Sequence, residues 1–235
     1  MEAIRVENLR KRYGKFEVLK GVNLTADFGK VTAILGPNAS GKTTLIKCIL
    51  GHVIPDSGSV YVKGLNTSEG VEYKRFIGYV PQEPDFPENL TPIEIINLIS
   101  SIRNSKALKA GEVIKSFKLG EFMTKKIKNL SGGTKQKVNL LLALAFDPEI
   151  LILDEPTVGL DPVSSVKFKE ILLKEKEKGK AIVMSSHIIS EVEELADQII
   201  FLMEGKVKVR GSVEELKDLA KESKLDRAIV KLLEE

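Results

Sequence analysis

Residues 30–51 read KVTAILGPNASGKTTLIKCILG and change character twice. The segment begins as an apolar, β-rich run, passes through a glycine-rich loop and continues with helical spacing that ends at Gly51. The loop GPNASGKTT, residues 36–44, fits the pattern G-x-x-x-x-G-K-[ST] in the strand–loop–helix context that the pattern requires. Backbone N–H groups of such a loop curl around phosphates at a helix N-terminus. The segment therefore predicts a nucleotide phosphate site in an α/β domain.

We expect the whole loop to contact the nucleotide. Lys42 supplies a positive charge to the β- and γ-phosphates, and the hydroxyl of Thr43 is placed to ligate Mg²⁺. The predicted nucleotide-binding residues of this loop are Gly36, Pro37, Asn38, Ala39, Ser40, Gly41, Lys42, Thr43 and Thr44.

A second segment, ILILDEP at residues 150–156, is a hydrophobic strand that ends in two carboxylates. Burying such groups is costly unless a cation or hydrogen bonds are present. Asp154 is predicted to hold Mg²⁺, usually through water, at the strand end beside the phosphate loop. Glu155 is a candidate to polarise the attacking water, although a solvated loop carboxylate without a role is a fair alternative for Glu155 alone.

His187 directly follows the strand-like run AIVMSS, residues 181–186. A lone histidine is more often structural than catalytic. Its strand, however, could lie beside the strand of Asp154, and active sites of open α/β sheets collect at the carboxyl ends of strands. There the imidazole could reach a γ-phosphate or the attacking water. His52 follows a helix-ending glycine and is assigned no role.

The rest of the chain alternates strands with helices. Residues 2–9 and 16–27 have the alternation of half-buried antiparallel strands, and residues 197–211 have the pattern of a closing hairpin. Helical patterns fill residues 92 to about 147, which predicts an all-helical insertion at about 85–147. Residues 212–235 predict a helical C-terminal extension within a single 1–235 domain. The fold class is therefore α/β with a helical insertion.

Local signals mark several helix starts. Thr91 with Glu94 forms a predicted capping box, and Asp161 is a predicted N-cap before Pro162. Ser190 with Glu193 is predicted to cap a further helix after His187. The lysine-rich segment 103–118 is interpreted as a solvated helix face, with a contact to a membrane subunit or anionic lipid as the alternative.

Composition sets broad limits on function. The chain has 235 residues and a net charge of +3, which is too small to argue for nucleic acid and predicts a mixed, solvated surface. A single cysteine, Cys48, allows neither an internal disulfide nor a cysteine-based metal site, and its apolar neighbours predict burial. The longest apolar run, residues 140–146, is far shorter than the roughly 20 residues that cross a bilayer. We expect the chain to stay in the cytoplasm.

Taken together, the motifs resemble those of the nucleotide-binding domain of an ABC (ATP-binding cassette) ATPase over about residues 2–210. Residues 36–44 resemble the Walker A motif, and residues 150–156 resemble the Walker B motif. Further resemblances are LSGGTKQKV (130–138) to the family signature, GLDP (159–162) to the D-loop, SSH (185–187) to the switch histidine, Gln82 to the Q-loop glutamine and Tyr13 to the adenine-stacking aromatic. The resemblance implies a P-loop NTPase core with a mainly parallel sheet, an N-terminal antiparallel β subdomain and an inserted all-helical subdomain.

The resemblance also implies composite sites. In this family two domains pack head to tail, and each signature closes over the ATP held by the other's Walker A. Ser131, Gly132 and Gly133 would bind that ATP, which fits their N–H groups at a helix start; without the resemblance, a helix N-cap with a flexible turn is the simpler interpretation. The family implies a dimer-interface role for Asp161, and catalytic and Mg²⁺-binding roles for Gln82.

One residue departs from the family pattern. The signature most often reads LSGGQ, and Thr134 stands in place of the glutamine. Because the Thr134 hydroxyl can still donate a hydrogen bond, we expect the signature site to be altered but not lost. We hypothesise two identical, competent sites in a homodimer, with a second, related ATPase chain as the alternative partner.

The function that best fits these motifs is ATP-driven transport through a separate transmembrane permease subunit. The chain is then expected to be peripheral on the inner face of the cell membrane. A soluble ABC ATPase of DNA repair, chromosome maintenance or translation is less favoured, because the Walker motifs lie close together, the chain has one cassette and it has no zinc module. A P-loop kinase would not explain the signature. The sequences of these motifs most resemble those of the export-type branch of the family. That branch includes drug, antibiotic and polysaccharide exporters and the copper-maturation ABC systems of nitrous oxide reductase. Import of amino acids or metal ions is the alternative.

Overall fold

The computed structural model describes residues 1–234 and contains two β-sheets. The smaller, antiparallel sheet has the strand order β2-β1-β4-β5. Its strands are β1 (Glu2–Tyr13), β2 (Phe16–Asp27), β4 (Ser57–Val62) and β5 (Leu65–Asn66). The larger sheet has the order β10-β9-β3-β8-β7-β6. Its strands are β3 (Val31–Leu35), β6 (Ile77–Val80), β7 (Ile150–Asp154), β8 (Ala181–Ser186), β9 (Gln198–Met203) and β10 (Lys206–Gly211).

The larger sheet is mainly parallel, as predicted. Strands β6, β7, β8, β3 and β9 run parallel, and β10 pairs antiparallel to β9 as the expected closing hairpin. The helices that surround the sheets are α1 (Lys42–Ile49), α2 (Pro92–Arg103), α3 (Ala110–Ser116), α4 (Gly132–Leu144), α5 (Pro162–Glu177), α6 (Ile189–Leu195), α7 (Val213–Ala220) and α8 (Leu225–Glu234). The expected α/β class is confirmed.

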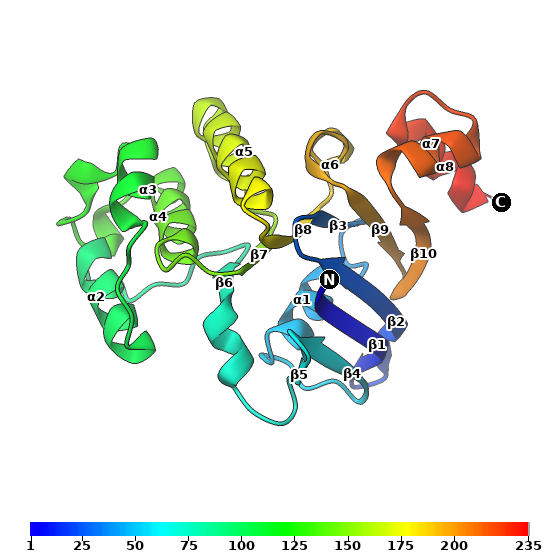
Figure 1. Cartoon of the computed structure of the whole chain (residues 1–235), viewed down its shortest axis with the longest axis horizontal. Coiled ribbons are helices and arrows are strands. Elements are labelled where there is room, and N and C mark those ends of the chain that lie inside the picture. The colour runs from blue at the N-terminus through cyan, green and yellow to red at the C-terminus, as the bar shows by residue number, and fades with distance from the viewer. Residues whose placement is uncertain (235) are drawn as a thin grey trace.

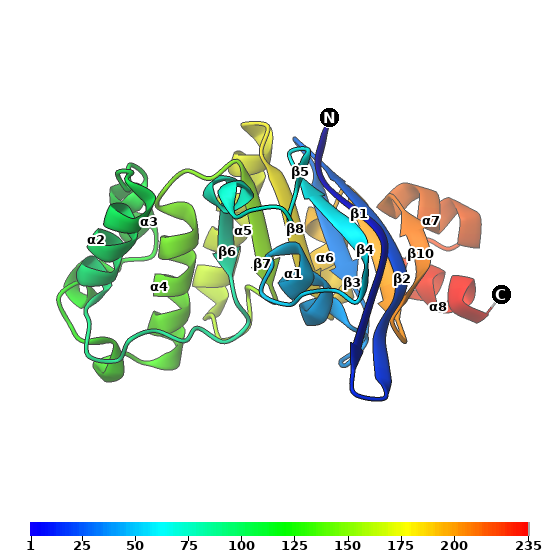
Figure 2. The same cartoon turned by 90° about the horizontal axis from the view of Figure 1, so that it is seen from below.

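Strands β3, β7 and β8 of the larger sheet are buried on both faces, which explains their near-continuous apolar sequences. In β3, Val31, Ala33 and Leu35 face one core, and Ile34 faces the other. Helix α1 lies between the two sheets, and α5 and α6 lie on the other side of the parallel sheet (Figures 1 and 2). The sheet therefore holds the ends of its strands rigidly between two packed layers.

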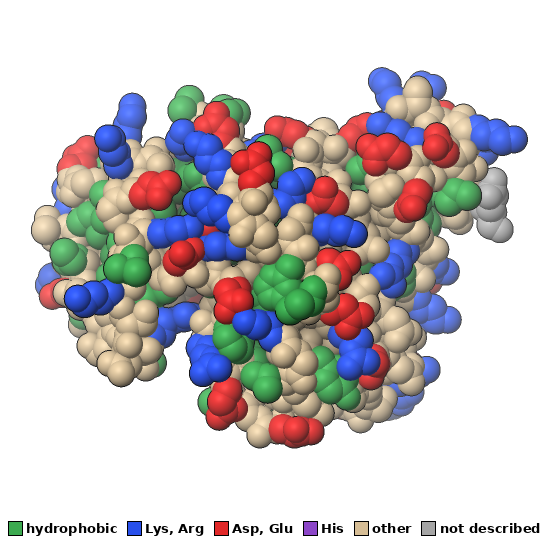
Figure 3. All heavy atoms as spheres, in the orientation of Figure 1, with side chains coloured by type: hydrophobic (Ala, Val, Ile, Leu, Met, Phe, Trp, Pro, Cys, Tyr) green, Lys and Arg blue, Asp and Glu red, His purple; other side chains and the backbone are tan. Residues whose placement is uncertain are grey.

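Helices α2, α3 and α4 form a lobe at one end of the molecule, and α7 and α8 lie at the other end (Figure 1). Short 3₁₀ helices at Gly120–Phe122 and Ile127–Asn129 connect α3 to α4. We call residues 92–144 the helical lobe. Basic and acidic side chains are interspersed over the face drawn in Figure 3, as the balanced composition predicts.

The predicted helix starts are confirmed at two positions and wrong at one. Thr91 and Glu94 form the capping box, and the side chain of Asp161 accepts a hydrogen bond from Ser164 N. The prediction for Ser190 and Glu193 is wrong, because α6 begins at Ile189 and places Ser190 inside the helix. The local reason is that Ser186 Oγ accepts the N–H of Ile188, 3.0 Å away, so the chain turns into the helix directly after β8.

One strand prediction needs correction. Strand β1 continues to Tyr13, well beyond the predicted end at residue 9, because its whole length pairs with β2. Strand β6 begins at Ile77, directly after the 3₁₀ helix Glu72–Phe76.

An ionic cluster ties the helical lobe to the core on the strand-start side of the sheet. Lys109 Nζ lies 2.7 Å from Glu175 Oε2 and 2.8 Å from Asp147 Oδ1. Lys178 and Lys180 also pair with Glu175, at 2.8 and 2.6 Å. Lys109 is therefore an exception to the predicted solvated face, because its side chain is largely buried against the core, whereas Lys106, Lys115 and Lys118 are exposed.

Cys48 is buried, as predicted, and burial raises the pKa of its thiol to about 11.

Within residues 1–234, none of the helices combines the length and the apolar character needed to cross a membrane.

Candidate functional site

The phosphate loop is held by close backbone contacts that require glycine. A Cβ on Gly36 would lie 2.1 Å from the carbonyl oxygen of Leu202 in β9. Gly41 caps α1 with a φ of 107°, in the left-handed region, and a Cβ there would lie 3.1 Å from Val18 O. The loop therefore leaves β3 and enters α1 in a geometry that side chains at these two positions would disrupt.

A cavity of about 520 Å³ lies over this loop. Most of the predicted site residues line it: Tyr13, Asn38, Ala39, Ser40, Gly41, Lys42, Thr43, Thr44, Gln82, Glu155 and His187. Gly36 and Pro37 lie behind Lys42, whose ammonium group donates hydrogen bonds to their carbonyl oxygens at 2.9 and 3.1 Å. Residues from distant parts of the sequence therefore meet around one cavity.

The carboxylate of Glu155 is the meeting point of three polar side chains. Its Oε1 atom lies 3.2 Å from Nδ1 of His187 and 3.7 Å from Nζ of Lys42. Its Oε2 atom accepts a hydrogen bond from Gln82 Nε2 at 3.3 Å. Glu155 is buried, so these contacts replace the water that the carboxylate loses on folding.

The backbone of Glu155 is also unusual. Its φ is 48°, in the left-handed region, where a residue with a side chain is strained. The N–H of Glu155 is held by Ser185, through the hydroxyl at 3.0 Å and the carbonyl oxygen at 3.3 Å. This conformation directs the carboxylate into the cavity from the end of β7.

Asp154 lies beneath Glu155 and is almost fully buried. As predicted, β7 and β8 are neighbours, and Asp154 pairs with Ser185 across the ladder. The Ser185 hydroxyl donates a hydrogen bond to Oδ1 of Asp154. Among residues 1–234, Oδ2 of Asp154 finds no hydrogen-bond partner. A buried carboxylate oxygen without a partner fits a divalent cation or its water, which prefers oxygen ligands.

Ser131, Gly132 and Gly133 lie outside this cavity, at the start of α4. Ser131 caps the helix: its Oγ accepts the N–H of Thr134 at 3.2 Å and lies 2.8 Å from the Thr134 hydroxyl. Ser131 and Gly132 are exposed. The structure thus shows an exposed helix N-cap at Ser131, which faces solvent instead of the phosphate loop of its own chain.

Helix α4 is tied to the loops around the cavity. The buried Asn139 donates a hydrogen bond to Pro81 O at 3.0 Å, and the buried Gln136 donates one to Pro156 O at 2.9 Å. Lys137 pairs with Asp161 at 2.8 Å. Hydrogen bonds from Lys137 and Ser164 hold the pKa of Asp161 well below its usual range. The helix that carries Ser131 is thereby connected to the segments that carry Gln82 and Glu155.

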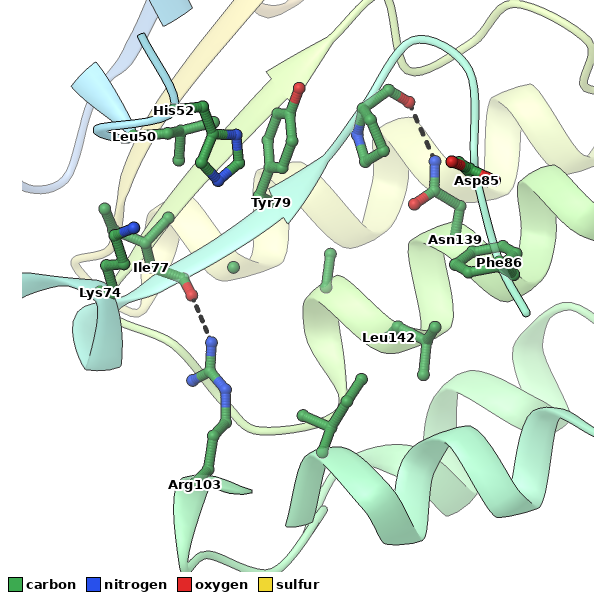
Figure 4. Close-up of a pocket in the computed structure, with 14 residues that line it drawn as sticks. Leu50, His52, Lys74, Ile77, Tyr79, Asp85, Phe86, Arg103, Asn139 and Leu142 are labelled. Atoms are coloured by element: carbon green, nitrogen blue, oxygen red, sulfur yellow. Dashed lines mark hydrogen bonds between the residues drawn. The ribbon is translucent and has the colours of Figure 1, made fainter. Parts of the chain in front are cut away.

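A groove of about 320 Å³ separates the core from the helical lobe (Figure 4). His52 and Lys74 lie on the core side, and Asp85 and Asn139 lie opposite. Arg103 of α2 closes one end and donates hydrogen bonds to Ile77 O at 2.8 Å and Arg75 O at 3.3 Å. Its floor is apolar and includes Ile77, Phe86, Ile99, Leu142 and Ala143.

Sequence reasoning missed residues in the cavity over the phosphate loop and in the groove beside the helical lobe. Phe16 and Val18 line the nucleotide cavity, and His52, to which no role was assigned, lines the groove. Phe16 and Val18 have the period-two spacing of one strand face, which was a usable signal once Tyr13 had been placed. Nothing local to His52 indicates the groove, because the opposite wall lies in another part of the chain.

Comparison with known proteins gives a consistent result. A family model described as ABC transporter matches residues 19–158. A second model, described as AAA domain, putative AbiEii toxin, Type IV TA system, matches the shorter stretch 126–193. The lantibiotic transport ATP-binding protein SrtF of Streptococcus pyogenes is 37% identical over 204 residues, which cover 87% of this chain and 88% of that protein. The bacitracin transport ATP-binding protein BcrA of Enterococcus faecalis is 36% identical, over 91% of this chain and 70% of that protein.

Solved structures agree with the sequence relatives. The structure of an ATP-binding subunit of an ABC transporter superposes with a TM-score of 0.92 and 30% identity, over 98% of this chain and 99% of the other. The dimeric structure of MJ0796, a bacterial ABC transporter cassette, has a TM-score of 0.81 and 30% identity, over 89% of this chain and 98% of the other.

Proposed function

Because the chain belongs to the ABC transporter family of ATP-binding proteins and is the ATP-hydrolysing subunit of such a transporter, we propose that it powers a separate permease that exports its substrate. The observation that carries export is the similarity to proteins named for lantibiotic and bacitracin transport, over most of this chain. Antimicrobial peptides are therefore the first substrates to test. The chain would act at the inner face of the cell membrane, held there by the permease.

We assign the ATP phosphates to the loop 36–44, where Lys42 is one of the residues that line the cavity. Mg²⁺ would be held by Thr43, Gln82 and Asp154, and the orphaned oxygen of Asp154 supports this assignment. The metal, when bound, neutralises charge that develops on the transferred phosphoryl group. Tyr13 would stack on the adenine at the outer end of the cavity.

For hydrolysis, Glu155 would polarise the attacking water, and His187 would hold the γ-phosphate or that water in place. Their contact within the cavity supports a shared role. In the ATP-free arrangement, Lys42 and Gln82 also contact the Glu155 carboxylate. Phosphate binding would draw Lys42 toward the nucleotide, which frees Oε1 of Glu155 for water.

We further propose that two copies of the chain close over two ATP molecules, with Ser131, Gly132 and Gly133 of each copy on the nucleotide of the other. The solvent-facing N-cap at Ser131 supports this arrangement, as does the similarity to a cassette solved as a dimer. Asp161 would lie at the same interface, beside the helix that Ser131 caps.

The groove between the core and the helical lobe is the proposed docking surface of the permease. It has an apolar floor with polar groups on its rim, and the hydrogen bond between Asn139 and Pro81 O joins it to the Q-loop. A movement of Gln82 on ATP binding would therefore reach the surface on which the permease sits.

The dimer proposal is tested by light scattering with MgATP. We expect Glu155→Gln to form an ATP-held dimer, because ATP binds and hydrolysis no longer reopens it. Adding Ser131→Arg should abolish the dimer, whereas adding the matched control Ser105→Arg, at an exposed position of the same lobe, should leave it intact. Monomers in every case would mean that closure needs the permease or a different cassette.

The transport proposal is tested in the cell that naturally contains the protein. Deletion of the gene should raise sensitivity to bacitracin or to a lantibiotic, and the natural chain should restore resistance. Glu155→Gln should fail to restore it. Lys74→Glu, in the groove, should keep the MgATP-held dimer in the Glu155→Gln background but fail to restore resistance on its own. Unchanged sensitivity to both peptides would reject this substrate class.

A further inference from the structure

The hairpin between β1 and β2 presents two aromatic side chains together. Tyr13 and Phe16 are direct cross-strand partners at its turn. Directly opposed residues of an antiparallel pair project from the same face, with Cβ atoms about 5 Å apart. Tyr13 and Phe16 both line the cavity above the phosphate loop, so the pair forms one wall beside residues 38–44.

The exposure of this pair is unusual for the molecule. Phe16 is 67% exposed and Tyr13 is 50% exposed, and all other Phe and Tyr side chains of residues 1–234 are buried or half-buried. Leaving a phenylalanine in water forgoes the free energy of burial, about 1.5–3 kcal/mol for a full side chain. A ligand that covers both rings would recover part of that free energy.

The surroundings of the pair leave room for a flat ligand. The Lys11 ammonium group lies over the ring of Tyr13, 5.5 Å from its centroid, and is fixed by a hydrogen bond to Ile54 O at 2.8 Å. Val18, two residues beyond Phe16 on the same strand face, extends the wall toward the loop. One face of Tyr13 thus carries a cation, and the wall continues through apolar side chains.

We propose that Phe16 is a second base-binding residue, which joins Tyr13 in a two-ring platform for the purine of the nucleotide. The inference rests on ATP binding in this cavity and not on transport. A purine covers more of such a platform than a pyrimidine does, so the platform selects nucleotides by the area of the base. Phe16 would contribute to affinity and selectivity and take no part in hydrolysis.

The test compares three ligands that share the triphosphate: MgATP, MgCTP and Mg-tripolyphosphate, measured by calorimetry. Phe16→Ala should weaken MgATP binding by about tenfold, in the range for loss of one base-stacking contact. Tripolyphosphate affinity should stay within about twofold, because that ligand has no base. The preference for MgATP over MgCTP should shrink, and Phe16→Trp should keep it.

Other outcomes would overturn the proposal. Unchanged MgATP affinity in Phe16→Ala would show that the ring does not touch the base. An equal loss of MgATP and tripolyphosphate would show that the substitution disturbs the loop instead. Phe16→Leu, which preserves most of the apolar volume, replaces Phe16→Ala if the latter fails to fold, and Lys15→Ala at the same turn is the control. If the natural chain bound neither ATP nor tripolyphosphate, the nucleotide site itself would be rejected. That result differs from failure of the Phe16 proposal, in which the natural chain still binds MgATP.

Discussion

Glu155 Oε1 and His187 Nδ1 lie 3.2 Å apart, at the ends of the neighbouring strands β7 and β8. The parallel pairing of these strands creates this contact between residues far apart in the sequence. Both side chains face the cavity that also contains Lys42. The contact joins the candidate base to the residue that would position the γ-phosphate, so changes at either residue should affect turnover more than nucleotide binding.

The first prediction concerns Glu155. Glu155→Gln keeps the shape of the side chain and removes its charge, so ATP turnover should fall about 100-fold or more while ATP affinity changes little. Steady-state phosphate release and equilibrium ATP binding check the two parts. Glu149→Gln is the matched control, because Glu149 directly precedes β7 and lies at the other end of that strand from Glu155. Equal loss of turnover in both variants would contradict the role of Glu155.

The second prediction concerns the orphaned carboxylate oxygen of Asp154. If this oxygen faces Mg²⁺, adding Mg²⁺ to the ATP-bound natural chain should raise its melting temperature further, through preferential binding to the folded state. Asp154→Asn should lose that Mg²⁺-dependent increment while keeping an increment from ATP alone. Thermal unfolding with ATP in EDTA and in Mg²⁺ measures both. A full Mg²⁺ increment in Asp154→Asn would place the metal elsewhere.

The third prediction concerns the pH dependence of stability through Glu175. Burial by itself raises the pKa of this carboxyl, but hydrogen bonds from Lys109, Lys178 and Lys180 outweigh burial and lower it to about 2. The unfolded value is about 4.3, so the folded state binds this proton more weakly. The stabilisation is therefore fully present above about pH 4.3 and is lost as the pH falls toward 2.

Lys109→Met is the variant that tests the third prediction. It should lower the free energy of unfolding at pH 7 by about 2 kcal/mol, because a buried carboxylate loses one of its three cations. The difference from the natural chain should shrink as the pH falls from about 4.3 toward 2. Lys125→Met, which removes an exposed pair with Glu121, should cost less than about 0.5 kcal/mol. A difference that is constant with pH would exclude Glu175 as the cause.

The fourth prediction concerns the tie between α4 and the Q-loop. Asn139 is buried and donates hydrogen bonds to Pro81 O and to Gln136 Oε1. Asn139→Leu leaves both acceptors without this donor, so the free energy of unfolding should fall by about 1–3 kcal/mol. Urea titration measures the change. Asn97→Leu, at an exposed position on α2, should stay within about 0.5 kcal/mol. Similar losses in the free energy of unfolding for the two variants would show that the hydrogen bonds of Asn139 do not stabilise the fold.

The sequence by itself determined the parts of this protein that depend on local order. The loop 36–44 follows a strand and precedes a helix because apolar spacing and glycines act over a few residues. The capping box of Thr91 and Glu94 is equally local, and the structure confirms it. The neighbouring positions of the Asp154 and His187 strands could also be inferred, since both are buried parallel strands that end in polar residues.

Only the tertiary structure decided the contacts that join distant segments. Phe16 enters the cavity because the hairpin folds over the phosphate loop, and His52 lines the groove because the helical lobe stands across from it. Lys109 reaches Glu175 across 66 positions, so a lysine that locally resembles part of a solvated face is largely buried. Ser190 was misplaced as a cap because Ser186 satisfies the Ile188 N–H first. Residue type and spacing describe what a side chain can do, whereas its partners depend on which distant backbone packs against it.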